Sequence, residues 1–201
     1  MDRNTGQYVA VKVMVDGANP EVLALFDKEW RILAELQHTN IIGLSDRGQF
    51  RDGSITYPYF VMPFLRGKTL HDRIAQNGSL TIGEVASIIG AAAAGLQAAH
   101  NRGVIHRDVK PSNIFILDSG SVVVIDFGVV HLGDSRTLST RKGTTPYIAP
   151  ELLDPQKRDT PTAQSDHFAL GVVCYEALTC VQPFARPTVN KLASAMTLVN
   201  H

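Results

Sequence analysis

The segment HRDVKPSN, residues 106–113, places two cations, an acid and an amide inside an otherwise apolar stretch of chain. Val104 and Ile105 precede it, and the apolar run 114–117 follows it directly. Burying so many polar groups is costly unless each one meets a partner or a ligand. The chain must therefore fold so that these side chains converge on one site beside a core.

The residues after this segment predict a β-hairpin. Two apolar runs, IFIL and VVVI, flank the turn sequence DSGS at 118–121. With a four-residue turn, Leu117 faces Val122, and the same register puts Asn113 opposite Asp126. The hairpin therefore brings an amide and a carboxylate together at one of its ends.

An amide oxygen beside a carboxylate forms a hard ligand pair that suits Mg²⁺, which also binds substrate phosphates. Asp108 and Lys110, on the loop before the hairpin, can reach the same point. An Asx turn or a strand-end aspartate would explain Asn113 or Asp126 alone. It would not explain four such residues converging.

The overall composition is that of an ordinary globular chain, with 201 residues of which 44% are hydrophobic. Its 19 Lys and Arg balance 19 Asp and Glu, so no net charge attracts nucleic acid or an anionic membrane. We expect neither partner, and a cytoplasmic location. Cys174 and Cys180 are expected to be buried free thiols. The apolar stretch 88–100 is expected to be a buried helix rather than a membrane span.

The N-terminal part predicts a strand over 8–15 followed by a helix over about 20–37. On a helical wheel, Glu29 falls inside the apolar arc of that helix. A carboxylate on a buried face requires a cation, and Lys12 in the preceding strand is the candidate. A solvated glutamate at the edge of the arc is the alternative.

The rest of the chain predicts strands first and then mainly helices. A hinge is expected at 63–68, where Pro63 and Gly67 interrupt the pattern. The expected strands are 41–44 and 57–62; the expected helices are 70–76, 82–100, 164–179 and one after Pro187, with irregular chain over 127–163.

Six motifs in order resemble those of the eukaryotic-type serine/threonine protein kinases: VAVK (9–12), Glu29, HRDVKPSN (106–113), DFG (126–128), APE (149–151) and SDHFALG (165–171). This resemblance implies an α+β, two-lobed kinase-like fold. A small, incomplete, β-rich N-lobe would span 1–62, a hinge 63–68, and a mostly helical C-lobe, lacking the last helices, 69–201.

The resemblance also implies the roles of the polar cluster. Asp108 would accept the proton of a substrate hydroxyl, and Lys110 would neutralise the γ-phosphate during transfer. Asn113 and Asp126 would hold Mg²⁺. His106 and Phe127 are expected to pack rather than react.

The resemblance further implies an ATP site. Lys12 would contact the α- and β-phosphates, with Glu29 holding the lysine in place. The adenine ring is expected at the hinge, where it would contact Ala10, Met62, Pro63, Leu65 and Phe115.

Lys110 and Thr144 resemble serine/threonine rather than tyrosine kinases, and Thr144 is expected to bond Asp108 and Lys110. Arg107 is a candidate partner for a phosphate on the activation segment, although loops are commonly rich in hydroxyls without regulation. The candidate phosphate acceptors are Ser135, Thr137, Ser139 and Thr140.

Both ends depart from the family pattern. Eleven residues precede Lys12 and no GxGxxG occurs, which predicts an exposed sheet edge along 8–15. Seventeen residues follow QPF (182–184), where the family has several helices. Arg186 is either the partner of Glu151, brought closer by a deletion, or an unrelated surface residue.

Three functions are each compatible with some of these sequence features. A serine/threonine protein kinase, transferring the γ-phosphate of ATP to protein Ser or Thr hydroxyls with Mg²⁺, fits the intact polar cluster. A non-catalytic pseudokinase, or a truncated module that binds nucleotide or a partner, fits the missing glycine loop. A small-molecule phosphotransferase would not need the sequence GTTPYIAPE.

Overall fold

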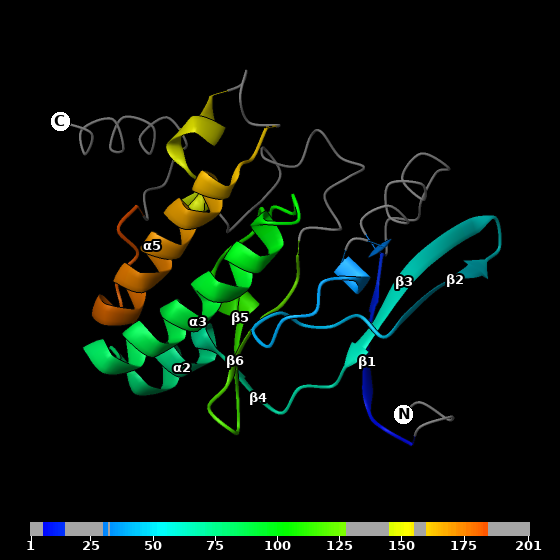
Figure 1. Cartoon of the computed structure of the whole chain (residues 1–201), viewed down its shortest axis with the longest axis horizontal. Helices are drawn as coiled ribbons and strands as arrows, with labels where there is room; N and C mark the ends of the chain where they lie inside the picture. The colour runs from blue at the N-terminus through cyan, green and yellow to red at the C-terminus, as the bar shows by residue number, and fades with distance from the viewer. Residues whose placement is uncertain (1–5, 15–29, 32, 128–144, 155–159, 185–201) are drawn as a thin grey trace.

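The computed structural model describes residues 6–14, 30–31, 33–127, 145–154 and 160–184 (Figure 1). Two small antiparallel sheets lie side by side; helices Leu70–Asn77 and Ile82–His100 pack against the second sheet, and helix Ala163–Thr179 packs against Ile82–His100. The first sheet has the order β1-β3-β2, and the second has the order β4-β5-β6. The strands are β1 (Val9–Val13), β2 (Asp46–Asp52), β3 (Ile55–Pro63), β4 (Gly67–Thr69), β5 (Ile114–Leu117) and β6 (Val122–Val124).

The first sheet confirms two of the predicted strands and corrects the third. β1 and β3 lie within or around the predicted ranges 8–15 and 57–62, and β1 forms an edge of the described sheet. The predicted strand 41–44 is wrong, because Ile41 makes only an isolated bridge to Val124. The strand between them is instead β2, whose sequence DRGQFRD is mostly exposed.

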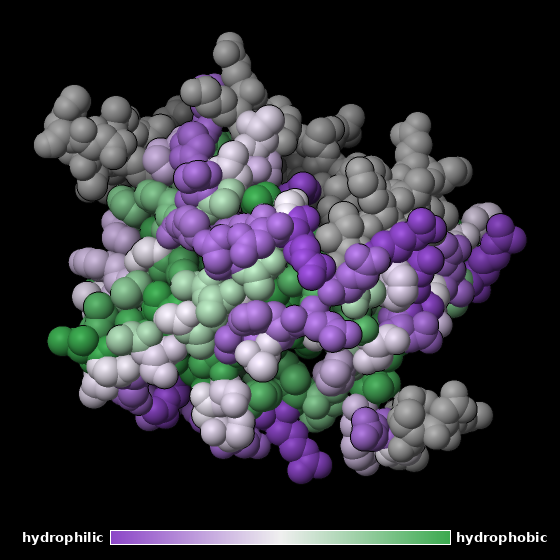
Figure 2. All heavy atoms as spheres, in the orientation of Figure 1, coloured by the Kyte–Doolittle hydropathy of each residue, from purple (hydrophilic) through white to green (hydrophobic). Residues whose placement is uncertain are grey.

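Polar β2 was missed because it carries no apolar alternation. It pairs with β3 through a two-residue turn in which Asp52 faces Ile55 and Gly53 has φ 59°. A Gly-Ser pair between two strands is a known hairpin signal, so the sequence did hold a marker for this turn. Figure 2 shows the corresponding end of the molecule as largely hydrophilic.

The β5–β6 hairpin forms as predicted, but its register differs by one residue. Ile116 faces Val122, and the Leu117 N–H donates to Ser121 O, so the loop consists of residues 118–120. Gly120 adopts φ 87°, which lets this shorter loop close. Asn113 therefore lies opposite Ile125, whose N–H donates to Asn113 O at 2.9 Å, and not opposite Asp126.

The helices agree with the predicted ranges: α2 (Leu70–Asn77), α3 (Ile82–His100) and α5 (Ala163–Thr179). Thr69 and Thr81 begin α2 and α3 with reciprocal capping boxes to Asp72 and Glu84. Short 3₁₀ turns are η1 (Pro111–Asn113), η3 (Thr145–Tyr147) and η4 (Pro150–Leu153). The predicted helix after Pro187 lies outside the described residues.

The hydrophobic core lies between α3, α5 and β6. Leu96, Ile114, Val124 and Val173 are almost completely buried within it. By length and composition alone, α3 could also cross a membrane. In this fold it packs against α5 and β6, as expected for a core helix.

Gly67 connects the two sheets. The first sheet ends at Pro63, residues 64–66 are irregular, and β4 begins at Gly67 with φ 144°. A Cβ at this position would lie 2.1 Å from the carbonyl oxygen of Ile116, so only glycine fits. The predicted division into 1–62, 63–68 and 69–201 stays a prediction.

The two cysteines are both free thiols, as predicted. Cys174 is partly buried, but Cys180 is exposed, so the prediction of burial is wrong for Cys180. It follows the last turn of α5 with φ 57°, outside the packed part of the helix.

Candidate active site

Asp108, Lys110 and Asn113 form one hydrogen-bonded cluster. The Asp108 carboxylate oxygen Oδ2 accepts from Lys110 Nζ at 2.7 Å and from Asn113 Nδ2 at 3.1 Å. Asn113 Nδ2 also donates to the Asp108 backbone oxygen at 2.7 Å. Pro111 starts the 3₁₀ turn η1, which brings Asn113 back toward Asp108.

The other oxygen of the same carboxylate, Asp108 Oδ1, is buried and has no hydrogen-bond partner among the described residues. A buried carboxylate oxygen without a donor is unfavourable. The cluster therefore holds this oxygen in a fixed position, with no donor for it among the described residues.

His106 joins this cluster to the residues before Asp126. Its side chain is fully buried, and Nε2 lies 2.9 Å from the Ile125 carbonyl oxygen, which can only accept. Nε2 therefore carries the hydrogen, and Nδ1 accepts from the Asp108 N–H at 3.2 Å. Burial lowers the pKa of His106, against the opposing charge of Asp166, which favours this neutral form.

Phe127 packs against His106, with ring centroids 4.6 Å apart. Phe127 is buried as well. Both residues therefore have the packing role that the sequence predicted for them.

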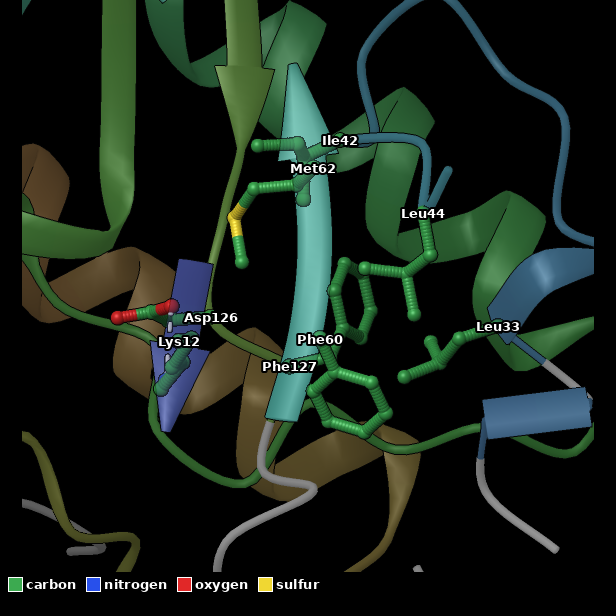
Figure 3. Close-up of a pocket in the computed structure, with 8 residues that line it drawn as sticks. All are labelled: Lys12, Leu33, Ile42, Leu44, Phe60, Met62, Asp126 and Phe127. Atoms are coloured by element: carbon green, nitrogen blue, oxygen red, sulfur yellow. Dashed lines mark ion pairs between the residues drawn. The ribbon is translucent and has the colours of Figure 1, made fainter. Parts of the chain in front are cut away.

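Lys12 and Asp126 form an ion pair, with Lys12 Nζ 2.8 Å from Asp126 Oδ1 (Figure 3). Lys12 lies in β1 opposite Phe60 of β3, and Asp126 follows β6 with φ 59°. This conformation is unusual for a residue other than glycine and turns the chain at the end of the hairpin. The predicted partner of Lys12, Glu29, lies outside the described residues.

A pocket adjoins this ion pair. Its empty volume, open solvent included, is about 400 Å³. Figure 3 shows Lys12 and Asp126 at one side and apolar side chains at the other. The apolar lining residues are Leu33, Ile42, Leu44, Phe60, Met62 and Phe127.

Most of these lining residues were not predicted as site residues. Leu33 belongs to the segment 20–37 that was predicted as a helix, and its side chain is buried. Ile42 and Leu44 were assigned to a strand that does not form. Hydrophobic pattern alone identified them as core, and nothing in it indicates which core residues border a cavity.

The predicted adenine contacts lie around the end of β3. Ala10 faces Met62 across the β1–β3 pair, and Met62 lines the pocket. Pro63 is exposed, whereas Leu65 and Phe115 are partly buried. Their contact with a nucleotide stays a prediction.

The side-chain oxygens of Asn113 and Asp126 are ligands that suit Mg²⁺. Because Asn113 uses its amide nitrogen as the donor to Asp108, its oxygen Oδ1 remains an acceptor. The Asp126 side chain is 38% exposed, so its carboxylate is accessible. The described residues contain no group of three or more His, Cys, Asp or Glu that could hold a metal. Mg²⁺ needs fewer protein ligands than that, because water and phosphates complete its coordination.

Asp166 supports the cluster from α5. It lies in the motif SDHFALG, and no local pattern in that motif indicates which groups its carboxylate binds. The structure shows that it accepts the N–H groups of His106 at 2.8 Å and Arg107 at 2.9 Å. The carboxylate therefore holds the backbone directly before Asp108.

Several other predictions fall on residues that the structure leaves undescribed. Thr144, the predicted partner of Asp108 and Lys110, lies outside the described residues, and so does Arg186, the predicted partner of Glu151. The same holds for the four candidate phosphate acceptors, Ser135, Thr137, Ser139 and Thr140.

A family model described as "Protein kinase domain" matches residues 1–199. The chain belongs to this family. It is 36% identical over 181 residues to the probable serine/threonine-protein kinase PknB of Lactococcus lactis, covering 88% of this chain and 28% of the relative. It is 39% identical over 189 residues to a probable serine/threonine-protein kinase of Clostridium perfringens, covering 90% of this chain and 26% of the relative.

The kinase fold is also found by structural comparison. The crystal structure of Rad53 1-466 in complex with AMP-PNP matches with a TM-score of 0.77 and 27% identity. The match covers the whole of this chain and 49% of the Rad53 1-466 chain. The predicted α+β, two-lobed kinase-like fold is therefore confirmed. This kinase chain spans less than a third of the length of the two bacterial relatives named above.

Proposed function

We propose that this chain is the catalytic part of a serine/threonine protein kinase that transfers the γ-phosphate of ATP to Ser or Thr hydroxyls of a protein substrate. One observation carries the proposal. The Asp108 carboxylate is held by Lys110 and Asn113 through one oxygen and keeps its other oxygen buried and unpaired among the described residues. A substrate hydroxyl can donate to that oxygen.

In the proposed reaction, Asp108 orients the hydroxyl and accepts its proton as the oxygen attacks the γ-phosphorus. The bond from the γ-phosphorus to the bridging oxygen of ADP breaks, and ADP leaves. Lys110, at 2.7 Å from Asp108, is close enough to neutralise charge on the transferring group. Asn113 restrains Asp108 through its two hydrogen bonds to that residue.

Lys12 is the proposed contact for the α- and β-phosphates. The side chain of its present partner, Asp126, is 38% exposed, so the pair can open when a polyphosphate arrives. Glu29 is proposed to support Lys12. The adenine ring is proposed to lie at the end of β3, against Ala10, Met62, Pro63, Leu65 and Phe115.

Mg²⁺ is proposed to bind Asn113 Oδ1 and the Asp126 carboxylate. When bound, the ion supplies positive charge that offsets the negative charge of the phosphates. A cytoplasmic location is proposed as well, where ATP and reducing conditions are available. We propose no nucleic-acid or membrane partner for this segment, whose Lys and Arg balance its Asp and Glu.

The decisive experiment compares wild type with Asp108→Asn in the transfer of labelled phosphate from ATP to a generic basic protein with Mg²⁺. We expect kcat to fall by about 10²–10⁴-fold in the variant, because the general base is lost. Asp52→Asn, an exposed aspartate at the end of β2, is the matched control and should retain activity. Equal transfer by wild type and Asp108→Asn would exclude the proposed role of Asp108.

The same assay separates the alternative function. A pseudokinase or nucleotide-binding module would bind ATP, measured by calorimetry, and transfer no phosphate in wild type. That outcome would reject the kinase proposal and leave the nucleotide site in place.

A further inference from the structure

A second groove lies between α2, α3 and β5, on residues that the candidate active site does not use. Its empty volume, open solvent included, is about 820 Å³, against about 400 Å³ beside the Lys12–Asp126 pair. Figure 1 shows α2 and α3 beside the sheet to which β5 belongs. This space is termed the α2–α3 groove, and it is large enough for a small organic ligand.

The most buried residues that line the α2–α3 groove are apolar. Ile88 of α3 is 8% exposed, and Ile116 and Leu117 of β5 are partly buried. Gly67 lines the same groove and adds no side chain to it. An aliphatic group placed against these residues would leave water, which favours binding.

One ion pair in the α2–α3 groove is already complete. Arg73 on α2 and Glu84 on α3 lie 2.8 Å apart. The second carboxylate oxygen of Glu84 accepts from the Thr81 N–H at 3.0 Å and from the Thr81 hydroxyl at 2.8 Å. Both oxygens of Glu84 therefore have partners, and the pair adds no net charge to the groove.

Two other charged side chains in the groove have no ionic partner. The Asp118 carboxylate, on the β5–β6 turn, has no hydrogen bond or ion pair within the part of the chain that the structure describes. Lys68 Nζ donates to the neutral amide oxygen of Gln76 at 2.8 Å and pairs with no acid in the same described part. The groove therefore offers one anion and one cation that a ligand can pair with.

The strand register brings these two charges to the same side of the second sheet. Lys68 lies opposite Ile116, and Asp118 follows two residues later, where its N–H donates to the Arg66 carbonyl oxygen at 3.0 Å. Alternate residues of a strand face one side, and diagonal cross-strand neighbours lie roughly 7–8 Å apart. A small group that carries both charges can therefore fit between them.

We propose that the α2–α3 groove binds a free α-amino acid with an aliphatic side chain, such as leucine. The ammonium group of the ligand pairs with Asp118, and its carboxylate pairs with Lys68. Its side chain covers Ile88 and Ile116. The two charges of an α-amino acid sit on one carbon, which matches the short separation of the two charged residues.

The charges in the groove favour a zwitterion over a ligand of one sign. A simple anion would face the carboxylates of Asp118 and Glu84, whereas a simple cation would face Lys68 and Arg73. None of these residues belongs to the Asp108 cluster, so the proposal does not depend on phosphate transfer.

The first test is calorimetry of the chain with L-leucine, for which we expect saturable binding with a Kd of about 1 mM or tighter. Leucinamide lacks the carboxylate and N-acetyl-leucine lacks the ammonium group, so each should bind at least about 10-fold more weakly. Glycine should lose at least about 10-fold as well, because it has no side chain to bury. No saturable binding of leucine up to about 20 mM would overturn the proposal. Equal affinities for leucine, leucinamide and N-acetyl-leucine would overturn it too.

Two variants test the proposed contacts. Asp118→Asn and Lys68→Met should each weaken leucine binding by at least about 10-fold, because each removes a charge that the ligand meets. Asp52→Asn and Arg51→Met, both exposed on β2, are the matched controls and should bind leucine as wild type does. Unchanged affinity in Asp118→Asn and Lys68→Met would disprove the proposed contacts, and so would an equal loss in the controls.

NMR chemical-shift mapping locates the ligand without any variant. Leucine should shift the amide signals of Ser87 and Gly120, which line the α2–α3 groove, and leave those of Phe60 and Met62 in place. Shifts confined to Phe60 and Met62 would put leucine in the candidate ATP pocket and overturn the proposal. A wild type that binds leucine in the groove but transfers no phosphate would disprove the proposed function alone.

Discussion

The two sheets differ in how far they shield the charged groups of the candidate site from solvent. The second sheet and α5 hold Asp108, Asn113 and His106 in a buried hydrogen-bonded network around Asp166. The first sheet contributes Lys12, whose ion pair with Asp126 is more than a third exposed on both sides. One region is fixed by burial, and the other depends on a contact that water can reach.

This difference corresponds to two tasks in phosphoryl transfer. The general base must be held in one geometry, because small displacements of reacting groups reduce rates strongly. A residue that receives a polyphosphate must instead exchange its partner when the ligand enters. Buried polar groups lose much when one partner is removed, whereas exposed ion pairs contribute little to stability.

The largest effect is expected from Asp166→Asn. Asparagine preserves the shape, but its amide nitrogen would face donors that now bond the carboxylate. We expect the free energy of unfolding, measured by urea titration, to fall by about 3 kcal/mol.

The exposed Asp118 provides the comparison for this prediction. Asp118→Asn should change the unfolding free energy by less than about 0.5 kcal/mol. Equal losses in the two variants would mean that burial does not separate the regions as we describe.

The helices could be predicted from sequence because their signals are local. Thr69 and Thr81 mark the starts of α2 and α3, and the apolar spacing within 82–100 requires no knowledge of distant residues. β1 and β3 were predicted from β-branched residues for the same reason. Polar β2 was missed, since its edge position and exposure remove the hydrophobic pattern.

The composition of the candidate cluster was predicted, but not its contacts. The residues Asp108, Lys110 and Asn113 are close in sequence, and the structure joins them. The hairpin register was wrong by one residue because loop length depends on whether Gly120 takes a left-handed conformation. The pairing of His100 with Asp166 spans 66 positions, and tertiary packing alone decides such contacts.

A second buried hydrogen-bonded network also includes a residue of α5. Its contribution to stability shows whether burial makes polar contacts strong there as well. The Tyr147 hydroxyl donates to Glu176, and Gln182 Nε2 donates to the tyrosine oxygen at 3.0 Å and to Glu176 Oε1 at 3.3 Å. Burial, followed by Glu176, raises the pKa of Tyr147, so the phenol remains a donor at neutral pH.

Tyr147→Phe should lower the free energy of unfolding by about 1–3 kcal/mol, because a buried carboxylate oxygen loses its donor. Tyr175→Phe is the control, because Tyr175 lies on the exposed side of α5. A thermal or urea midpoint that moves equally in both variants would argue against a tight network.

The pH dependence of stability should report on His106. Its pKa in the folded chain is lowered from the ordinary value of 6.5, chiefly by burial, so the unfolded chain binds this proton more readily. The stabilisation is therefore complete above pH 6.5 and is lost as the pH falls from there through the folded pKa. The slope for one proton is at most about 1.4 kcal/mol per pH unit.

Urea titrations at several pH values in wild type and His106→Gln measure this contribution. Stability at neutral pH falls in the variant, but the quantity compared is the slope below pH 6.5, which should be shallower in His106→Gln. Identical slopes would assign the acid sensitivity to other groups.

The smallest effect on stability is expected where the site is most exposed. Lys12→Met removes the ion pair to Asp126 and retains the apolar stem of the side chain. The free energy of unfolding should change by less than about 1 kcal/mol, because both partners are solvated and their interaction is screened.

Affinity for ATP, measured by calorimetry, should nevertheless fall by about 10-fold or more, since a charged hydrogen bond to the phosphates is lost. Lys68→Met is the matched control, because Lys68 is exposed and bonds Gln76 outside the pocket. A large loss of stability with unchanged affinity in Lys12→Met would contradict this prediction and make Lys12 a structural residue rather than a nucleotide contact.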